Sequence, residues 1–196
     1  MKSPLFLGVL GSGKGSNFRA IMDRIRAGKL HAEVRLVISD VPDAGILGLA
    51  RAFEVPALTL RPSRFRTKLD PEVEAEAVQA LKQAAVEWVV LAGFMRLVKA
   101  PLLDAFPRRV INVHPSLLPK YPGLSAWKQA LEAGEQATGC TVHYVDRGMD
   151  TGDIIAQREV PIRADDTPDA LHARIQKAEH DLLPEVLAEL AESPAR

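Results

Sequence analysis

The sequence predicts an α/β protein with a Rossmann-like, doubly wound and mostly parallel sheet that ends in an antiparallel edge. Short apolar runs of the kind found in buried parallel strands alternate with stretches of helical periodicity. That βαβαβ alternation is typical of a parallel sheet with helices on both faces. Later in the chain, two strand patterns at 138–145 and 154–160 follow one another across a polar turn, which predicts a hairpin at the edge.

The first half of the chain supplies the parallel part of the sheet. We expect strands at 5–10, 34–39, 57–60 and 86–92. The intervening helices are expected from about Phe18 to Gly28, at 44–53 and at 70–85. The third of these begins with an aspartate, a proline and a glutamate, a sequence typical of a capped helix start.

The second half begins with a short helix at 101–106 and a central strand that starts at Val110. A helix at 127–133 ends at a glycine, and the last helix begins at Thr167 with a proline at its first position. Pro184 is expected to kink that last helix. We find no linker or repeat, so residues 1–196 are interpreted as one domain.

Composition restricts the class of protein. The 47% hydrophobic and 26% charged residues are ordinary for a soluble globular protein, and 25 basic residues balance 25 acidic ones. Zero net charge argues against nucleic acid as a partner. The single cysteine, Cys140, excludes an internal disulfide, and no run approaches the roughly 20 apolar residues of a membrane helix. We expect no membrane partner and a cytoplasmic location.

The stretch 109–123 organises the rest of the chain. Alternation along a strand puts Asn112 and His114 on one face, so an amide donor lies beside an imidazole where a strand ends. Three prolines then restrict the loop that follows. This arrangement suits an acyl-transfer site. Taken alone, however, the pair fits a capping asparagine and a half-buried histidine better.

The glycine-rich turn at 11–17 lies between a strand and a helix, where backbone N–H groups converge. It nearly matches a Walker A loop, but Gly15 stands at the position of the magnesium-binding hydroxyl. It also misses the dinucleotide fingerprint, because Ser16 stands where the third glycine belongs. A phosphate cradle without magnesium remains, with Ser16 and Asn17 as donors; the alternative is a plain tight turn.

The turn at 146–153 carries three aspartates, but Thr151 and Gln157 occupy the positions where an EF-hand needs glycine and glutamate. Asp150 is instead a candidate carboxylate partner for a histidine. The remaining histidines of interest have no suggestive neighbours and are interpreted as surface or packing residues: His31, His143 and His172. No metal site is expected.

Taken together, the segments 13–17 (GKGSN), 91–96 (LAGFMR) and 112–123 (NVHPSLLPKYPG) resemble the formyltransferase family that uses 10-formyltetrahydrofolate. Segments 139–145 and 149–152 extend the resemblance, which runs from Leu5 to about Pro184. It implies direct transfer of the formyl group to the amine of glycinamide ribonucleotide through a tetrahedral intermediate. The products would be formylglycinamide ribonucleotide and tetrahydrofolate, in purine (IMP) biosynthesis. The formyl folate is then a co-substrate, and no metal takes part.

The resemblance also implies the site residues. The catalytic residues are Asn112, His114 and Asp150, with Asn112 also facing the folate. The amide would donate to the formyl oxygen, a protonated imidazole would stabilise it, and the carboxylate would hold that imidazole. Gly15, Ser16 and Asn17 would cradle the phosphate and Glu179 would reach the ribose. The folate residues are Met95, Arg96, Leu97, Val98 and Lys68, with Arg66 as a rival to the lysine. Leu118–Pro119 is expected to be a cis peptide.

The sequence departs from the family pattern at Ser125, Trp127 and Arg147, so contacts near the folate or substrate can differ. Among related activities, the transfer RNA enzyme is expected to carry a C-terminal domain, and the deformylase an N-terminal one. Neither is expected here, since the first strand begins at Leu5 and 196 residues leave no room. A non-catalytic nucleotide-binding module is the alternative from another class. The expected partners are small-molecule substrates, and a homodimer is compatible with the sequence.

Overall fold

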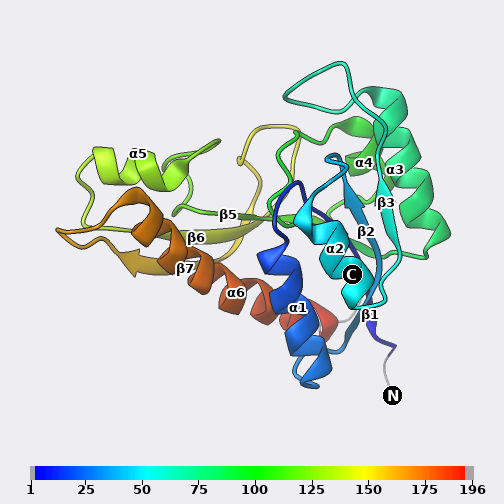
Figure 1. Cartoon of the computed structure of the whole chain (residues 1–196), viewed down its shortest axis with the longest axis horizontal. Helices are drawn as coiled ribbons and strands as arrows, with labels where there is room; N and C mark the ends of the chain where they lie inside the picture. The colour runs from blue at the N-terminus through cyan, green and yellow to red at the C-terminus, as the bar shows by residue number, and fades with distance from the viewer. Residues whose placement is uncertain (1–2, 193–196) are drawn as a thin grey trace.

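The computed structural model describes residues 3–192. They form a seven-stranded sheet in the order β3-β2-β1-β4-β5-β6-β7 (Figure 1). The five parallel strands are β1 (Leu5–Leu10), β2 (Ala32–Ser39), β3 (Ala57–Thr59), β4 (Trp88–Leu91) and β5 (Val110–His114). Two antiparallel pairings add β6 (Ala137–Tyr144) and β7 (Ile154–Pro161). The predicted doubly wound sheet with an antiparallel edge is confirmed.

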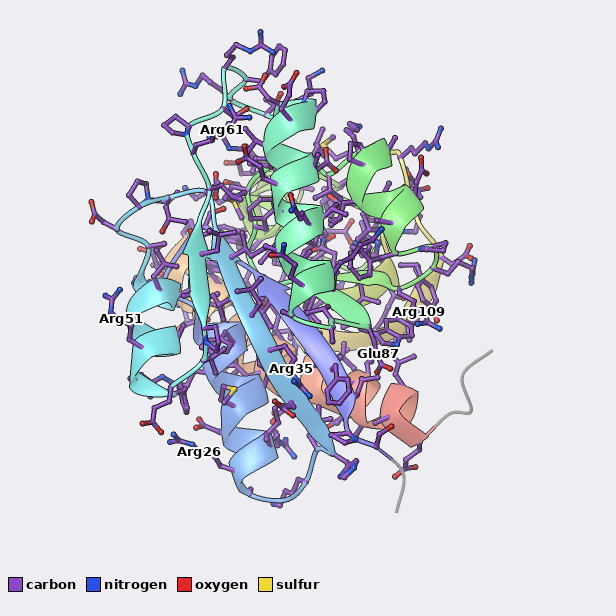
Figure 2. The ribbon with its side chains drawn as sticks, turned by 90° about the vertical axis from the view of Figure 1, so that its right-hand side faces the viewer. Arg26, Arg35, Arg51, Arg61, Glu87 and Arg109 are labelled. Atoms are coloured by element: carbon purple, nitrogen blue, oxygen red, sulfur yellow. The ribbon has the colours of Figure 1, made fainter. Side chains whose placement is uncertain are left out.

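Helices cover both faces of this sheet. On one face the buried core joins the sheet to α1 (Ser16–Arg26), α2 (Gly45–Ala52) and α6 (Pro168–Glu192). On the other it joins the sheet to α3 (Pro71–Gln83) and α4 (Ala100–Ala105), which stand in front of the strands in Figure 2. The remaining helix, α5 (Ala126–Glu132), packs against α6 and β6. Both faces of the inner parallel strands are therefore covered, as their near-continuous apolar sequences require, while the edge strand β3 is largely exposed.

The two ends of the parallel strands differ in their chemistry. Figure 2 labels Glu87 and Arg109, which precede β4 and β5 and mark the amino end, and Arg61, which follows β3 at the opposite end. The polar segments of the sequence follow the strands and gather at the carboxyl end. Open α/β sheets bind ligands at this end, where the strand order reverses, and here β1 and β4 flank that reversal.

The sequence predicts Asp70 as the side-chain N-cap of the third helix, and that prediction is wrong. Asp70 does precede α3, but its side chain does not cap the helix. Its carboxylate instead accepts hydrogen bonds from the backbone N–H and the Nε of Arg64, at 2.7 and 2.8 Å, and from the hydroxyl of Ser63 at 3.1 Å. Thr167 behaves as predicted, because its Oγ1 accepts from the N–H of Ala170 at 3.2 Å. Of residues 3–192, no helix is long and apolar enough to cross a membrane.

Candidate active site

The carboxyl-terminal half of β5 carries the first two residues of the site, Asn112 and His114. Asn112 and His114 lie on one face of the strand, while Ile111 and Val113 on the other face join the hydrophobic core shared with α6. The predicted facing is therefore correct. The cis peptide expected at Leu118–Pro119 is also present in the loop that leaves β5.

His114 is buried, with only 4% of its surface exposed. Its Nε2 lies 2.9 Å from the carbonyl oxygen of Tyr121, and its Nδ1 lies 3.4 Å from Oδ2 of Asp150. Both neighbours are acceptors, so an imidazolium would donate at both nitrogens. Burial nevertheless lowers the pKa of His114 below its ordinary value, against the raising effects of Asp150 and the Tyr121 carbonyl. At neutral pH the free protein therefore holds His114 mainly neutral, whereas the sequence analysis expects it protonated.

Asp150 comes from the turn between β6 and β7 and lies at the centre of the polar cluster. Its Oδ2 accepts the N–H of Gly123 at 2.8 Å, and its Oδ1 lies 3.4 Å from Nδ2 of Asn112. Burial acts to raise the pKa of this carboxyl. Hydrogen bonding to His143, the charge of His114 and the Gly123 N–H outweigh it, and the pKa lies below its usual range. The structure brings Asn112, His114 and Asp150 together.

His143 also belongs to this cluster, so its interpretation as a surface or packing residue is wrong. It is 2% exposed, and its Nε2 lies 3.1 Å from Nδ2 of Asn112 and 3.6 Å from Oδ1 of Asp150. In the antiparallel pairing of β5 with β6, it stands directly opposite Asn112. The predicted strand at 138–145 contains the signal that would find it, because Thr141 and His143 share the face that meets Asn112 and His114.

A second polar network holds the loop that supplies the Tyr121 carbonyl. Thr141 Oγ1 donates to the carbonyl of Ser116 at 2.7 Å and accepts the N–H of Leu118 at 3.1 Å. Gln157 of β7 reaches the same hydroxyl and the Leu118 carbonyl, each at 2.9 Å. These bonds tie the proline-containing loop to the antiparallel hairpin. The hairpin therefore fixes both the loop beside His114 and the turn that carries Asp150.

The glycine-rich turn runs from the end of β1 into α1. Gly15 has φ of 79° and a Cβ there would lie 2.8 Å from Cα of Ile46, so a larger residue fits neither the backbone nor the space. Ser16 is the first residue of α1 and is partly exposed. Asn17 is buried, and its Nδ2 donates to Oε2 of Glu179 at 3.0 Å, while its Oδ1 has no partner. Two of the four residues predicted to meet the ribonucleotide, Asn17 and Glu179, thus contact each other across 162 positions.

Glu179 lies on α6 and is 5% exposed. Burial raises its pKa to about 7, although the Asn17 amide acts in the other direction. A surface hollow of about 690 Å³ adjoins this region and is lined by Lys14, Ser16 and Arg19, among others. None of the three predicted catalytic residues lines that hollow. We therefore assign it no role in the chemistry at β5.

The segment after β4 is anchored to the ends of β1 and β2. Asp40 accepts from Ser12 Oγ at 2.5 Å and from Arg96 Nε at 2.8 Å, and the Met95 N–H donates to Ser12 Oγ at 2.9 Å. Arg96 also donates to the carbonyl of Phe65. Sequence reasoning missed Ser12 and Asp40. Asp40 directly follows β2 and Ser12 lies two residues after β1, so both lie at the carboxyl end of the sheet.

The residues predicted to line the folate pocket differ in exposure. Met95 is 57% exposed, whereas Val98 is 3% exposed and packs into the core beneath α3 and α4. Leu97 pairs with Lys68 in an isolated bridge, which brings the lysine beside this segment. The Lys68 ammonium lies 4.4 Å from the centre of the Phe65 ring. Arg66 is exposed, so the structure favours Lys68 over Arg66 as the cation beside the segment.

The three departures from the family pattern have structural roles. Ser125 precedes α5 in a left-handed conformation, with φ of 56°. Trp127 stacks on His172 with ring centroids 3.7 Å apart. Arg147 pairs with Asp104 at 3.1 Å, and both side chains are largely exposed. None of these contacts reaches the cluster around Asp150.

Cys140 offers no nucleophile. It lies within β6, is fully buried, and burial raises the pKa of its thiol to about 12. Among residues 3–192, no group of three or more His, Cys, Asp or Glu side chains could hold a metal ion. The polar cluster instead offers an amide donor and two imidazoles, each within 3.6 Å of the ionised Asp150 carboxylate. Such groups can stabilise an oxyanion and transfer a proton without a covalent intermediate.

A doubly wound sheet with this cluster at the end of β5 defines the class of protein, and the chain belongs to the formyl transferase family, whose profile matches residues 7–187. Its relatives are phosphoribosylglycinamide formyltransferases. The enzyme of that name from Bacillus subtilis (strain 168) is 42% identical over 182 residues, covering 93% of this chain and 92% of that one. The crystal structure of glycinamide ribonucleotide transformylase 1 from Symbiobacterium toebii matches with a TM-score of 0.93 and 44% identity. That match covers 98% of this chain and 90% of the other.

Longer relatives match as well. The trifunctional purine biosynthetic protein adenosine-3 of Drosophila melanogaster is 50% identical over 192 residues, which cover 95% of this chain. The present chain spans only 14% of the length of that protein and of its Drosophila pseudoobscura pseudoobscura counterpart. The shared segment therefore corresponds to one part of a larger polypeptide in flies and to most of the bacterial enzyme.

Proposed function

We propose that this protein transfers the formyl group of 10-formyltetrahydrofolate to the amine of glycinamide ribonucleotide, in de novo purine biosynthesis. The products are formylglycinamide ribonucleotide and tetrahydrofolate. The observation that carries the proposal is the convergence of Asn112, His114 and Asp150 at the carboxyl end of β5. It is supported by relatives from Bacillus subtilis and Escherichia coli that are 42% and 40% identical, and whose own names state this activity.

The catalytic roles follow from the charge that develops during transfer. When the amine attacks the formyl carbon, negative charge collects on the formyl oxygen, and a donor aimed at that oxygen is worth about 3 kcal/mol. The Asn112 amide is the neutral donor in this proposal. Its contact to Asp150 is 3.4 Å long, so one N–H can pass from the carboxylate to the substrate oxygen at little cost.

His114 carries the proton. Because burial keeps it mainly neutral, it can accept the proton that the attacking amine releases, and the resulting imidazolium then stabilises the adjacent oxyanion. The imidazolium gives this proton to the leaving folate nitrogen as the C–N bond breaks. Asp150 stabilises the charged imidazole through the 3.4 Å contact, so the pair favours the step in which His114 is protonated.

The ribonucleotide is assigned to the turn at the start of α1. Backbone N–H groups of Gly15 and Ser16 and the positive end of the α1 dipole suit a phosphate. Asn17 and Glu179, now bonded to each other, are assigned to the phosphate and ribose edges of the same ligand. Oδ1 of Asn17 has no partner in the free protein, which leaves an acceptor for a ligand hydroxyl.

The formyl folate is assigned to the segment Met95–Val98. The bonds from Arg96 to Asp40 and Phe65 fix this segment, and the exposed Met95 offers apolar surface to an aromatic ring system. The adjacent Lys68 provides positive charge for a carboxylate of the folate. We further propose that residues 1–196 act as one formyltransferase domain in the cytoplasm, with a homodimer as the assembly to test.

The test is a folate absorbance assay with glycinamide ribonucleotide as the acceptor, monitored as tetrahydrofolate forms. Turnover that requires both substrates supports the proposal. A chain that binds the ribonucleotide in calorimetry but ignores a folate analogue is the non-catalytic nucleotide-binding module instead. Formate release from the folate without an acceptor would identify a deformylase, and formylation of methionyl transfer RNA would identify the remaining rival.

A further inference from the structure

We propose that His143 is a positioning residue that orients the side-chain amide of Asn112, so that its N–H group and not its carbonyl oxygen faces the reaction centre. The inference rests on the proposed formyl transfer, which requires a donor at that place. It begins from the geometry of one buried imidazole, whose Nδ1 lies beside a carbonyl acceptor and whose Nε2 lies beside a side-chain amide.

The first bond fixes the tautomer of His143. Its Nδ1 lies 2.8 Å from the carbonyl oxygen of Tyr144, which can only accept, so Nδ1 must carry a hydrogen. In the neutral ring Nε2 then carries the lone pair, and its 3.6 Å contact with Oδ1 of Asp150 becomes a hydrogen bond only when the ring is protonated. Only 2% of His143 is exposed, so water cannot substitute for either partner without a change in the fold.

The second bond transmits this constraint to Asn112. An Nε2 lone pair 3.1 Å away needs a donor, and Asn112 can present one only by turning its NH₂ group towards the ring. The same NH₂ group lies 3.4 Å from Oδ1 of Asp150, an acceptor in its ionised form. With one hydrogen directed at His143, the second remains directed at the place where Asp150, and in the reaction the formyl oxygen, can accept it.

The fold provides this contact through strand register. Asn112 and His143 stand opposite each other in the β5–β6 pairing, where cross-strand neighbours are close. The β6–β7 pairing shifts its register between Val142 and His143, and such bulges commonly redirect side chains beside active sites. Without the His143 acceptor, rotation of the Asn112 amide by 180° would point its carbonyl oxygen at the developing negative charge.

The test compares His143→Phe, which keeps a planar ring but removes the Nε2 acceptor, with His143→Gln, whose amide oxygen can replace it. His143→Phe should lower kcat roughly 10- to 100-fold, with KM for both substrates within about threefold. His143→Gln should recover most of that loss. His31→Phe, on an exposed histidine ahead of β2, is the matched control and should keep wild-type kcat.

A double-mutant cycle separates positioning from a structural effect. In an Asn112→Ala background, His143→Phe should cause little further loss of kcat, because the group that it orients is already absent. The inference would be overturned if the losses of kcat from Asn112→Ala and His143→Phe multiply in the double variant. It would also be overturned if His143→Gln fails to restore turnover, or if His143→Phe keeps near-normal kcat.

A measurement on the wild-type protein covers the case in which His143→Phe does not fold. The imidazole ¹⁵N resonances of His143 should report hydrogen on Nδ1 and none on Nε2, and the reverse tautomer would overturn the inference. If the wild-type chain shows no turnover with glycinamide ribonucleotide, the proposed function fails. The ¹⁵N resonances then decide the role of His143 by themselves.

Discussion

Oδ2 of Asp150 lies 3.4 Å from Nδ1 of His114, although the aspartate comes from the β6–β7 turn and the histidine from the end of β5. The distance is longer than a strong charge-assisted hydrogen bond. The contact is therefore weaker than a charge-assisted hydrogen bond, yet close enough for the carboxylate to act on the charge of the imidazole. Oδ2 is held in place by the N–H of Gly123 at 2.8 Å.

The first prediction concerns how much Asp150 and His114 each contribute to turnover. Asp150→Asn and His114→Ala should each lower kcat by roughly two to three orders of magnitude, because each removes charge or proton transfer at the transition state. Ligand binding should stay measurable by calorimetry, since neither residue is assigned to the phosphate or to the folate ring.

Asp153→Asn is the matched control for this prediction. Asp153 lies near the other end of the same turn and pairs with Arg108 at 3.0 Å, with both side chains about 70% exposed. Its replacement should leave kcat unchanged. Near-normal turnover in Asp150→Asn or His114→Ala would remove the proposed mechanism.

Much of this architecture was predictable because apolar periodicity records which face of each element is buried. The strand at residues 5–10 has the predicted bounds, and the hairpin after residue 137 is found as expected. Local pattern was insufficient where a partner outside the helix competes for the same side chain. Asp70 has the sequence of a helix cap, yet the backbone N–H and guanidinium of Arg64 take its carboxylate instead.

The same distinction between local sequence pattern and long-range contacts applies to the residues of the candidate site. Asn112, His114 and Asp150 could be named because contiguous motifs carry them. His143 could not, because a histidine within an alternating strand gains meaning only when the register opposite Asn112 is known. Ser12 and Asp40 were missed for a related reason, since their bond joins the ends of two different strands.

The second prediction concerns the pKa of His114. Burial lowers it and Asp150 raises it, so Asp150→Asn should lower it further. If catalysis needs the neutral imidazole to accept the amine proton, kcat/KM should fall as pH decreases through this pKa. The acid limb should then move to lower pH in Asp150→Asn. Titration of the His114 ring by NMR measures the shift directly, and a pKa that rises in the variant would contradict it.

The third prediction concerns Gly152, two residues after Asp150. A Cβ at this position would lie 1.8 Å from the carbonyl oxygen of Tyr144, which also accepts from His143. Gly152→Ala should therefore displace the turn, destabilise the fold by about 1–3 kcal/mol and lower kcat. Gly48→Ala on α2 is the matched control, because its Cβ would meet only the end of the Arg51 side chain at 3.9 Å. Urea denaturation and kcat that match wild type in Gly152→Ala would contradict this packing.

The fourth prediction concerns Cys140. A fully buried thiol with a pKa of about 12 provides almost no thiolate at neutral pH, and the thiolate is the reactive form. Iodoacetamide should therefore leave both Cys140 and turnover unchanged in the folded protein, and should modify the residue after denaturation. Mass spectrometry measures the modification. Rapid labelling of the folded protein with loss of activity would reopen a role for the thiol.

The last prediction concerns Glu179, whose pKa burial raises from 4.5 to about 7. A carboxyl that binds its proton more tightly when folded contributes stability that is fully present below pH 4.5 and lost as pH rises through about 7. The difference between the two values corresponds to roughly 3 kcal/mol. Glu179→Gln keeps an acceptor for Asn17 without the charge, so its free energy of unfolding relative to wild type should rise between pH 5 and pH 8.

Glu185→Gln, on the same helix, separates this burial effect from a general change in charge. Glu185 is exposed and pairs with Arg158, so its removal should shift stability little at either pH. Urea denaturation at pH 5 and pH 8 measures all three proteins. If the stabilities of wild type and Glu179→Gln change in parallel with pH, then Glu179 is ionised in the folded protein at no cost. In that case Asn17 would donate an ordinary hydrogen bond to an ionised Glu179. The carboxylate that meets a ribose hydroxyl would then already be charged in the free protein.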